Sequence, residues 1–96
     1  MEIKMQAINF IASDKLEAYV EKKVSKVEKL FDQLSMAEVF LKVVKPESVA
    51  NKEASIKMAA PNVDFFASKT ANSFEQAIDE CVEALERQIL KQKNKK

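Results

Sequence analysis

The chain has 96 residues, of which 47% are hydrophobic and 32% are charged, and its formal net charge is +1 at pH 7. This length allows one domain, and the composition is that of a folded domain rather than of a disordered chain. Because the net charge is so small, only a local clustering of charge can argue for binding to nucleic acid.

Residue types that are absent or rare exclude several function classes. The chain has no glycine and no histidine, and Cys81 is its single cysteine. Phosphate-binding loops and dinucleotide fingerprints need glycine, and general acid-base catalysis and metal binding most often use histidine. A single cysteine cannot form an internal disulfide. The sequence therefore predicts a protein that is not an enzyme, with no cofactor, no metal site and no small-molecule substrate.

The sequence also shows no signal peptide and no membrane-spanning segment. Its first ten residues have neither the unbroken apolar run nor the cleavage site of a signal peptide. No window approaches the ~20 apolar residues that a membrane span needs. Together with the single cysteine, this predicts a cytoplasmic protein with no membrane partner.

The first predicted elements are a strand and a long helix. Residues 2–7 alternate polar and apolar side chains, as a half-buried strand does. Ser13 and Asp14 offer helix N-caps, and the apolar spacing that follows predicts a helix from about Asp14 to Gln33. Its apolar face contains Leu16, Tyr19, Val20, Val24, Val27, Leu30, Phe31 and Leu34.

Three further strands are predicted by the same alternation of polar and apolar residues. They cover residues 38–44, 54–59 and 63–68. Pro46 ends the first of them and opens a connecting loop over residues 45–52, and Pro61 and Asn62 form a turn between the other two.

A second helix is predicted near the C-terminus. Ser73, with Gln76 three residues later, is a capping box, and apolar residues repeat at helical spacing as far as Ile89. The helix should end near Lys91, and residues 92–96 should form a flexible basic tail.

The order strand, helix, three strands, helix predicts an α+β fold in one domain spanning residues 1–96. A two-layer β-α-β-β-β-α arrangement, with both helices on one face of a four-stranded sheet, buries every apolar face. The long first connection makes the first two strands parallel if they are adjacent, and the short later connections predict hairpins.

The first helix carries its lysines and its acids on opposite borders of the apolar face. On a wheel that advances ~100° per residue, four lysines fall within roughly 60° of one another on one border. We call them the first basic flank: Lys15, Lys22, Lys26 and Lys29. The acids on the other border are Glu17, Glu21, Glu28 and Asp32.

The second helix repeats this segregation. Its basic flank consists of Arg87, Lys91 and Lys95, spaced four residues apart. Its acidic flank consists of Glu75, Asp79, Glu83 and Glu86. Surface helices usually interleave the two signs, so the segregation favours contact with a polyanion. If the helices pack side by side, the two basic flanks would join into one band.

Particular residues make the chain resemble the ribosome hibernation-promoting factors, a family also called ribosome-associated inhibitor A or sigma-54 modulation protein. The resemblance covers almost the whole chain and rests on segments in both helices and two strands. These are residues 19–32, 39–43, 65–68 and 77–79, with Leu85, Arg87, Gln88, Lys91 and Lys93. Relatives commonly have glycines near residues 59–62 and 70–72, where this chain has none.

The resemblance implies a fold like that of double-stranded RNA-binding domains. It also implies a bacterial translation inhibitor of stress and stationary phase, which binds ribosomal RNA of the small subunit where messenger and transfer RNA bind. The positions matching the family's RNA contacts are Lys23, Lys26, Arg87, Lys91 and Lys93. The charge pattern adds Lys22, Lys29, Lys95 and Lys96. The chain looks like the short form of the family, which in some bacteria needs a separate ribosome dimerisation factor.

Two other interpretations remain open from the residues alone. Each basic flank is also explained as a solvated helix border, with the C-terminal lysines complementing the helix dipole. The predicted outer face of the sheet carries Phe40 and Phe66 beside Lys42 and Lys57, which suits a module that regulates another protein or a surface that stacks on bases.

Overall fold

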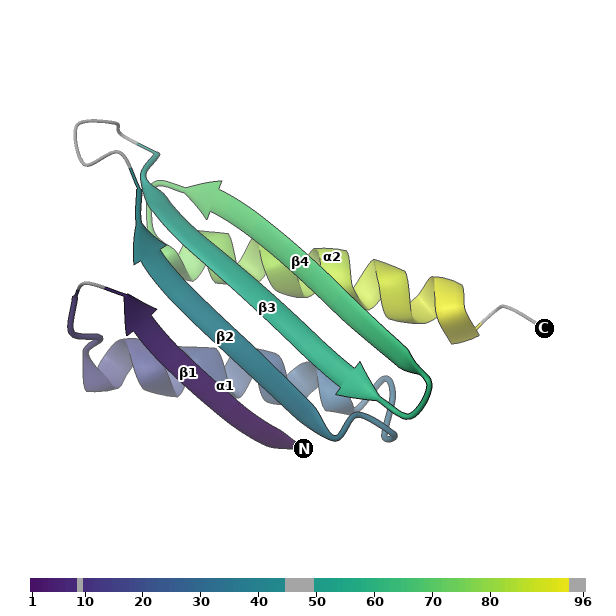
Figure 1. Cartoon of the computed structure of the whole chain (residues 1–96). Helices are drawn as coiled ribbons and strands as arrows, with labels where there is room; N and C mark the ends of the chain where they lie inside the picture. Colours follow the sequence, from purple (N-terminus) through teal and green to yellow (C-terminus); the bar gives the residue numbers. More distant parts are fainter. Residues whose placement is uncertain (9, 45–49, 94–96) are drawn as a thin grey trace.

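A computed structural model describes residues 1–8, 10–44 and 50–93 (Figure 1). Its elements are β1 (Glu2–Ile8), α1 (Asp14–Glu28), β2 (Met36–Val43), β3 (Lys52–Ala60), β4 (Val63–Ala71) and α2 (Phe74–Lys93). This order confirms the predicted β-α-β-β-β-α arrangement. No helix in these ranges is long and apolar enough to cross a membrane.

The four strands form one mixed sheet in the order β1-β2-β3-β4. β1 and β2 are parallel, since α1 carries the chain back along the sheet, and the β2–β3 and β3–β4 pairs are antiparallel. Both helices cover the same face of this sheet and lie side by side (Figure 1). Neither helix of the described ranges covers the opposite face of the sheet, so the fold is the predicted two-layer one (Figure 1).

The core lies between the sheet and the two helices. The inward side chains of the central strands are fully buried, among them Leu41, Ile56 and Met58. From the helices they meet residues such as Val24 and Leu85, which are also fully buried. Each buried aliphatic side chain of this size contributes about 1.5–3 kcal/mol, so the core fixes the rotation of each helix and with it the direction of each flank.

Serine side chains cap the start of both helices. The Ser13 hydroxyl accepts a hydrogen bond from the Leu16 amide at 3.1 Å. The Ser73 hydroxyl accepts one from the Gln76 amide, also at 3.1 Å. Both predicted helix starts are therefore confirmed to within one residue, because the cap satisfies an amide that has no partner inside the helix.

The prediction that the first helix reaches Gln33 is wrong. α1 ends at Glu28, and the amides of Lys29, Leu30 and Phe31 instead bond to carbonyls three residues back. These tighter turns keep Leu30 and Phe31 packed against the core, so the apolar spacing continues after the α-helix has stopped. A pattern of apolar residues cannot distinguish the two kinds of turn.

The second helix, by contrast, is longer than predicted. α2 continues to Lys93, so Gln92 and Lys93 are helical rather than part of a tail. The Lys93 ammonium donates to the Leu30 carbonyl at 2.9 Å, which ties the end of α2 to the chain that leaves α1. The remainder of the predicted tail, including Lys95, lies outside the described residues.

β3 and β4 extend beyond their predicted ranges because they pair along their whole length, from Lys52 opposite Ala71 to Ala60 opposite Val63. The turn between them is the predicted one. Asn62 has a φ of 68°, the left-handed conformation that glycine adopts most easily and asparagine tolerates better than most residues. Asparagine thus makes this turn in a chain that has no glycine. Residues 45–49 of the predicted loop lie outside the described residues.

Candidate nucleic-acid interface

One residue of the first basic flank, Lys26, faces the second helix together with Lys23. Lys23 and Lys26 of α1 line a groove of about 240 Å³ whose other wall is formed by α2. The α2 residues in this groove are Asp79, Val82, Glu83 and Glu86. The basic border of α1 therefore lies beside the acidic border of α2.

The basic flank of α2 lies on the opposite border of that helix, over the edge of the sheet. Lys91 lines a groove with Val63 and Asp64 at the start of β4, the last strand of the sheet. Arg87 is one helical turn before Lys91 and is exposed. The two basic flanks therefore do not join into one band as expected, because the acids of α2 lie between them.

Tyr19, Lys23 and Asp79 form a polar cluster between the two helices. The Tyr19 hydroxyl donates to Asp79 Oδ1 at 2.7 Å, and Lys23 Nζ lies 3.4 Å from the same oxygen. The Lys23 ammonium also lies 5.5 Å from the centre of the Tyr19 ring, within cation–π distance. The hydrogen bond to Asp79, reinforced by desolvation and by the charges of Asp79 and Glu75, raises the pKa of Tyr19 to about 12.

This cluster divides the lysines of α1 into two groups. The Lys23 side chain is only 28% exposed and its charge is balanced by Asp79, so an RNA phosphate would have to displace that carboxylate. Lys22, Lys26 and Lys29 are exposed. Together with Lys15, which is also exposed, they are the lysines of α1 and its C-cap that a phosphate reaches without breaking an ion pair described here.

Lys93 also has a structural partner. Its ammonium binds the Leu30 carbonyl, on the side of α2 that faces α1, and so it stands apart from Arg87 and Lys91. Positive charge near the last carbonyls of a helix is stabilising, which gives Lys93 a role within the fold.

Gln88 is a residue whose role the sequence did not indicate. Its side-chain oxygen accepts from the Phe66 amide at 3.3 Å, and its amide nitrogen donates to the Phe66 carbonyl at 2.7 Å. The side chain thus occupies the edge of β4 as a neighbouring strand would. It lies between Arg87 and Lys91 and fixes that border of α2 against the sheet. A glutamine beside an apolar face shows no pattern that predicts this bond.

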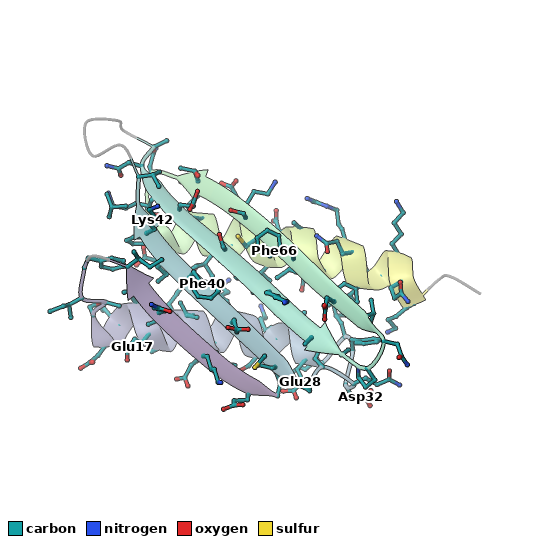
Figure 2. All side chains as sticks on the ribbon, viewed as in Figure 1. Glu17, Glu28, Asp32, Phe40, Lys42 and Phe66 are labelled. Atoms are coloured by element: carbon teal, nitrogen blue, oxygen red, sulfur yellow. The ribbon has the colours of Figure 1, made fainter. Side chains whose placement is uncertain are left out.

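The open face of the sheet carries the predicted aromatic and basic side chains, but they do not form one patch (Figure 2). Phe66 is 56% exposed and lies opposite Lys57, whereas Phe40 is half-buried and lies opposite Ser55. Phe40 and Phe66 are therefore in different rows and are separated by β3. Two strand spacings and an offset of two residues along the strands place their Cα atoms about 12 Å apart, so they do not stack on each other.

Cys81 is a core residue, as predicted. Its thiol donates to the Ala54 carbonyl, with a sulfur–oxygen distance of 3.2 Å, and burial raises its pKa to about 11. The thiol therefore stays protonated and unreactive at neutral pH. Within the part of the chain that the structure describes, no three histidine, cysteine or acidic residues are grouped so as to hold a metal ion.

Comparison with known proteins shows which family the chain belongs to. Residues 3–96 match the family model described as sigma 54 modulation protein / S30EA ribosomal protein. The chain belongs to this family. The chain is also 28% identical over 95 residues to a ribosome hibernation promoting factor from Azotobacter vinelandii, an alignment that covers 99% of this chain and 85% of that protein.

Solved structures agree with the fold. A ribosomal subunit interface protein from Coxiella burnetii superposes with a TM-score of 0.88 and 22% identity, covering 99% of this chain and all of that one. The N-terminal domain of Protein Y from Thermus thermophilus gives a TM-score of 0.81 and 27% identity, over 95% of this chain and 98% of that one. At this level of identity the first of these comparisons demonstrates a shared fold.

The match to the sigma 54 modulation protein / S30EA family confirms the family that the sequence resemblance predicted. The family is one of ribosome-associated factors and not of enzymes.

Proposed function

We propose that this protein binds ribosomal RNA of the small subunit near the messenger and transfer RNA sites, and so inhibits translation while ribosomes are stored. The observation that carries this proposal is the family match over residues 3–96, on a fold that exposes both basic flanks. The proposal places the protein in the cytoplasm, acting as a single domain, with a separate ribosome dimerisation factor as a further partner.

The charges suit the recognition of RNA by its backbone. Lysine and arginine side chains that contact phosphates release counterions, and a folded RNA surface is recognised by its shape and its phosphates. Because the acids of α2 lie between the two flanks, a single RNA strand that crossed both would pass over negative charge. We infer that the flanks contact two separate stretches of backbone.

The predicted RNA-binding residues fall into three groups under this proposal. Lys22, Lys26, Lys29, Arg87 and Lys91 are exposed and contact phosphates directly. Lys23 and Lys93 contribute only after leaving Asp79 and the Leu30 carbonyl. Lys95, outside the described residues, remains a predicted contact.

Sedimentation with purified small subunits tests the proposal. The wild-type protein should pellet with the subunits at low salt and much less at high salt, because the contacts are electrostatic. Arg87→Glu combined with Lys91→Glu should abolish co-sedimentation at moderate salt while circular dichroism stays unchanged. Wild-type protein that fails to pellet even at low salt would refute ribosome binding.

A matched variant separates this function from the second candidate, a module that regulates another protein through the open sheet face. The observation that favours the second candidate is the exposed Phe66 beside Lys57. Lys4→Glu combined with Lys57→Glu makes the same change of charge on that face. We expect this variant to pellet with the subunits as the wild type does. If this variant alone failed to pellet, the open sheet face and not the basic flanks would be the surface that binds the subunit.

A further inference from the structure

The face of β1 that points toward α1 is incompletely covered. The inward residues Ile3 and Met5 are only half-buried, whereas inward residues of β2 and β3 such as Val39 and Ile56 are fully buried. A groove of about 230 Å³ lies over them. It is lined by Ile3, Met5, Val20, Glu17 and Glu21. The groove has an apolar floor and an acidic rim.

β1 also offers backbone hydrogen-bonding groups beside this groove. It is the first strand of the sheet and, in the ranges described, pairs only with β2. The Glu2 amide points toward β2, since it donates to the Ser35 carbonyl at 3.0 Å. Because successive residues of a strand point to opposite sides, the amides of Ile3, Met5 and Ala7 point away from the sheet. The β4 edge differs, since Gln88 binds it there.

The charge around the groove indicates which kind of molecule could bind there. Glu17 and Glu21 are exposed. Glu28 lies further along the same border of α1 (Figure 2), where its carboxylate pairs with the Met1 ammonium at 2.7 Å, so the charge that faces the groove is that of Glu17 and Glu21. Nucleic acid would be repelled by this border. A second copy of the chain, paired edge to edge through β1, would bring two such borders together. A cationic chain has complementary charge.

We propose that β1 and the acidic border of α1 form a docking site for an extended peptide segment of another protein, with lysine or arginine at every second position. The segment adds a fifth strand beside β1. Its basic side chains lay their aliphatic stems over Ile3 and Met5 and bring their charged ends to Glu17 and Glu21. The intervening side chains lie on the open face, where Lys4 disfavours further positive charge. The site is independent of ribosome binding.

The test uses two fluorescein-labelled peptides of identical composition, one alternating lysine with threonine and one with all its lysines in a single block. Fluorescence anisotropy should show at least about tenfold tighter binding of the alternating peptide, because only strand geometry turns every lysine toward α1. Amide hydrogen exchange should slow at Ile3, Met5 and Ala7 on binding. Equal affinity for both peptides, or exchange that does not change at these amides, would overturn the proposal.

Charge-reversed variants complete the test. Glu17→Lys combined with Glu21→Lys should weaken binding of the alternating peptide by about tenfold or more. Glu83→Lys combined with Glu86→Lys makes the same change of charge in the groove between the helices and should leave the peptide affinity within about twofold. Equal losses in both variants would show a general charge effect and rule out this site.

Discussion

Asp79 joins the two helices through its contacts with Tyr19 and Lys23. The sequence predicted that Asp79 lies on the acidic border of its helix and that Tyr19 lies in the core. Each prediction leaves out the contact between these two residues. Tyr19 packs against the core with its ring, and its hydroxyl reaches out of the core to Asp79 at 2.7 Å. A helical wheel describes one helix at a time, so a bond between the borders of two helices was not predictable from it.

The raised pKa of Tyr19 can be measured directly, because the chain has one tyrosine and no tryptophan. Titration followed by the absorbance of tyrosinate should give a pKa of about 12, compared with the ordinary 10.0. In Asp79→Ala the pKa should fall toward the ordinary value, since the main acceptor and nearest negative charge are removed. An unchanged pKa in this variant would contradict the hydrogen bond.

The same shift has a consequence for stability at high pH. A neutral tyrosine whose pKa is raised by folding stabilises the native state fully below pH 10.0, and this contribution is lost as the pH rises toward about 12. The wild type should therefore lose more stability over this range than Asp79→Ala does. Urea unfolding at several pH values, followed by circular dichroism, provides the measurement.

At the scale of an element, the two helices show which features a local sequence pattern predicts and which it does not. Their starts were predicted because a serine cap is a local signal, and it acts through one hydrogen bond within the first turn. Their ends were not, since tight turns after Glu28 and the bond from Lys93 to Leu30 depend on packing between elements.

The caps should contribute measurably to stability. Ser73→Ala should lower the free energy of unfolding by about 1 kcal/mol, and Ser13→Ala by a similar amount, because each leaves an amide of the first turn without its partner. Ser73→Asp retains an acceptor and is the control. Urea denaturation checks the values, and equal stability of the alanine and aspartate variants would show that the caps contribute nothing.

At the scale of the whole molecule, the decisive feature is the separation of the two basic flanks by the acids of α2. If both flanks contact ribosomal RNA, each exposed lysine that binds a phosphate adds to the salt dependence of binding. Lys26→Ala and Lys91→Ala should each lower the slope of log K against log salt by about one, and together by about two.

Filter binding to small subunits over a series of salt concentrations measures these slopes. Lys57→Ala on the open sheet face is the control and should leave the slope unchanged. A slope that changes for only one of the two helices would show that the other flank is a solvated border, as the residues alone also allowed.

The sequence by itself determined the element order, the apolar face of each element and the segregation of charge on each helix. Apolar and charged residues recur at the residue period of the helix or strand that contains them, so these features can be predicted from short stretches of sequence. Only the tertiary structure decided which borders meet. Side-by-side packing on the sheet brings Asp79 next to Lys23, turns Lys91 toward the β4 edge, and leaves Glu17 and Glu21 over β1. These contacts depend on the order of the strands and on the rotation of each helix, which the packing of the core determines. A helical wheel describes one helix alone, so it gives no information on either.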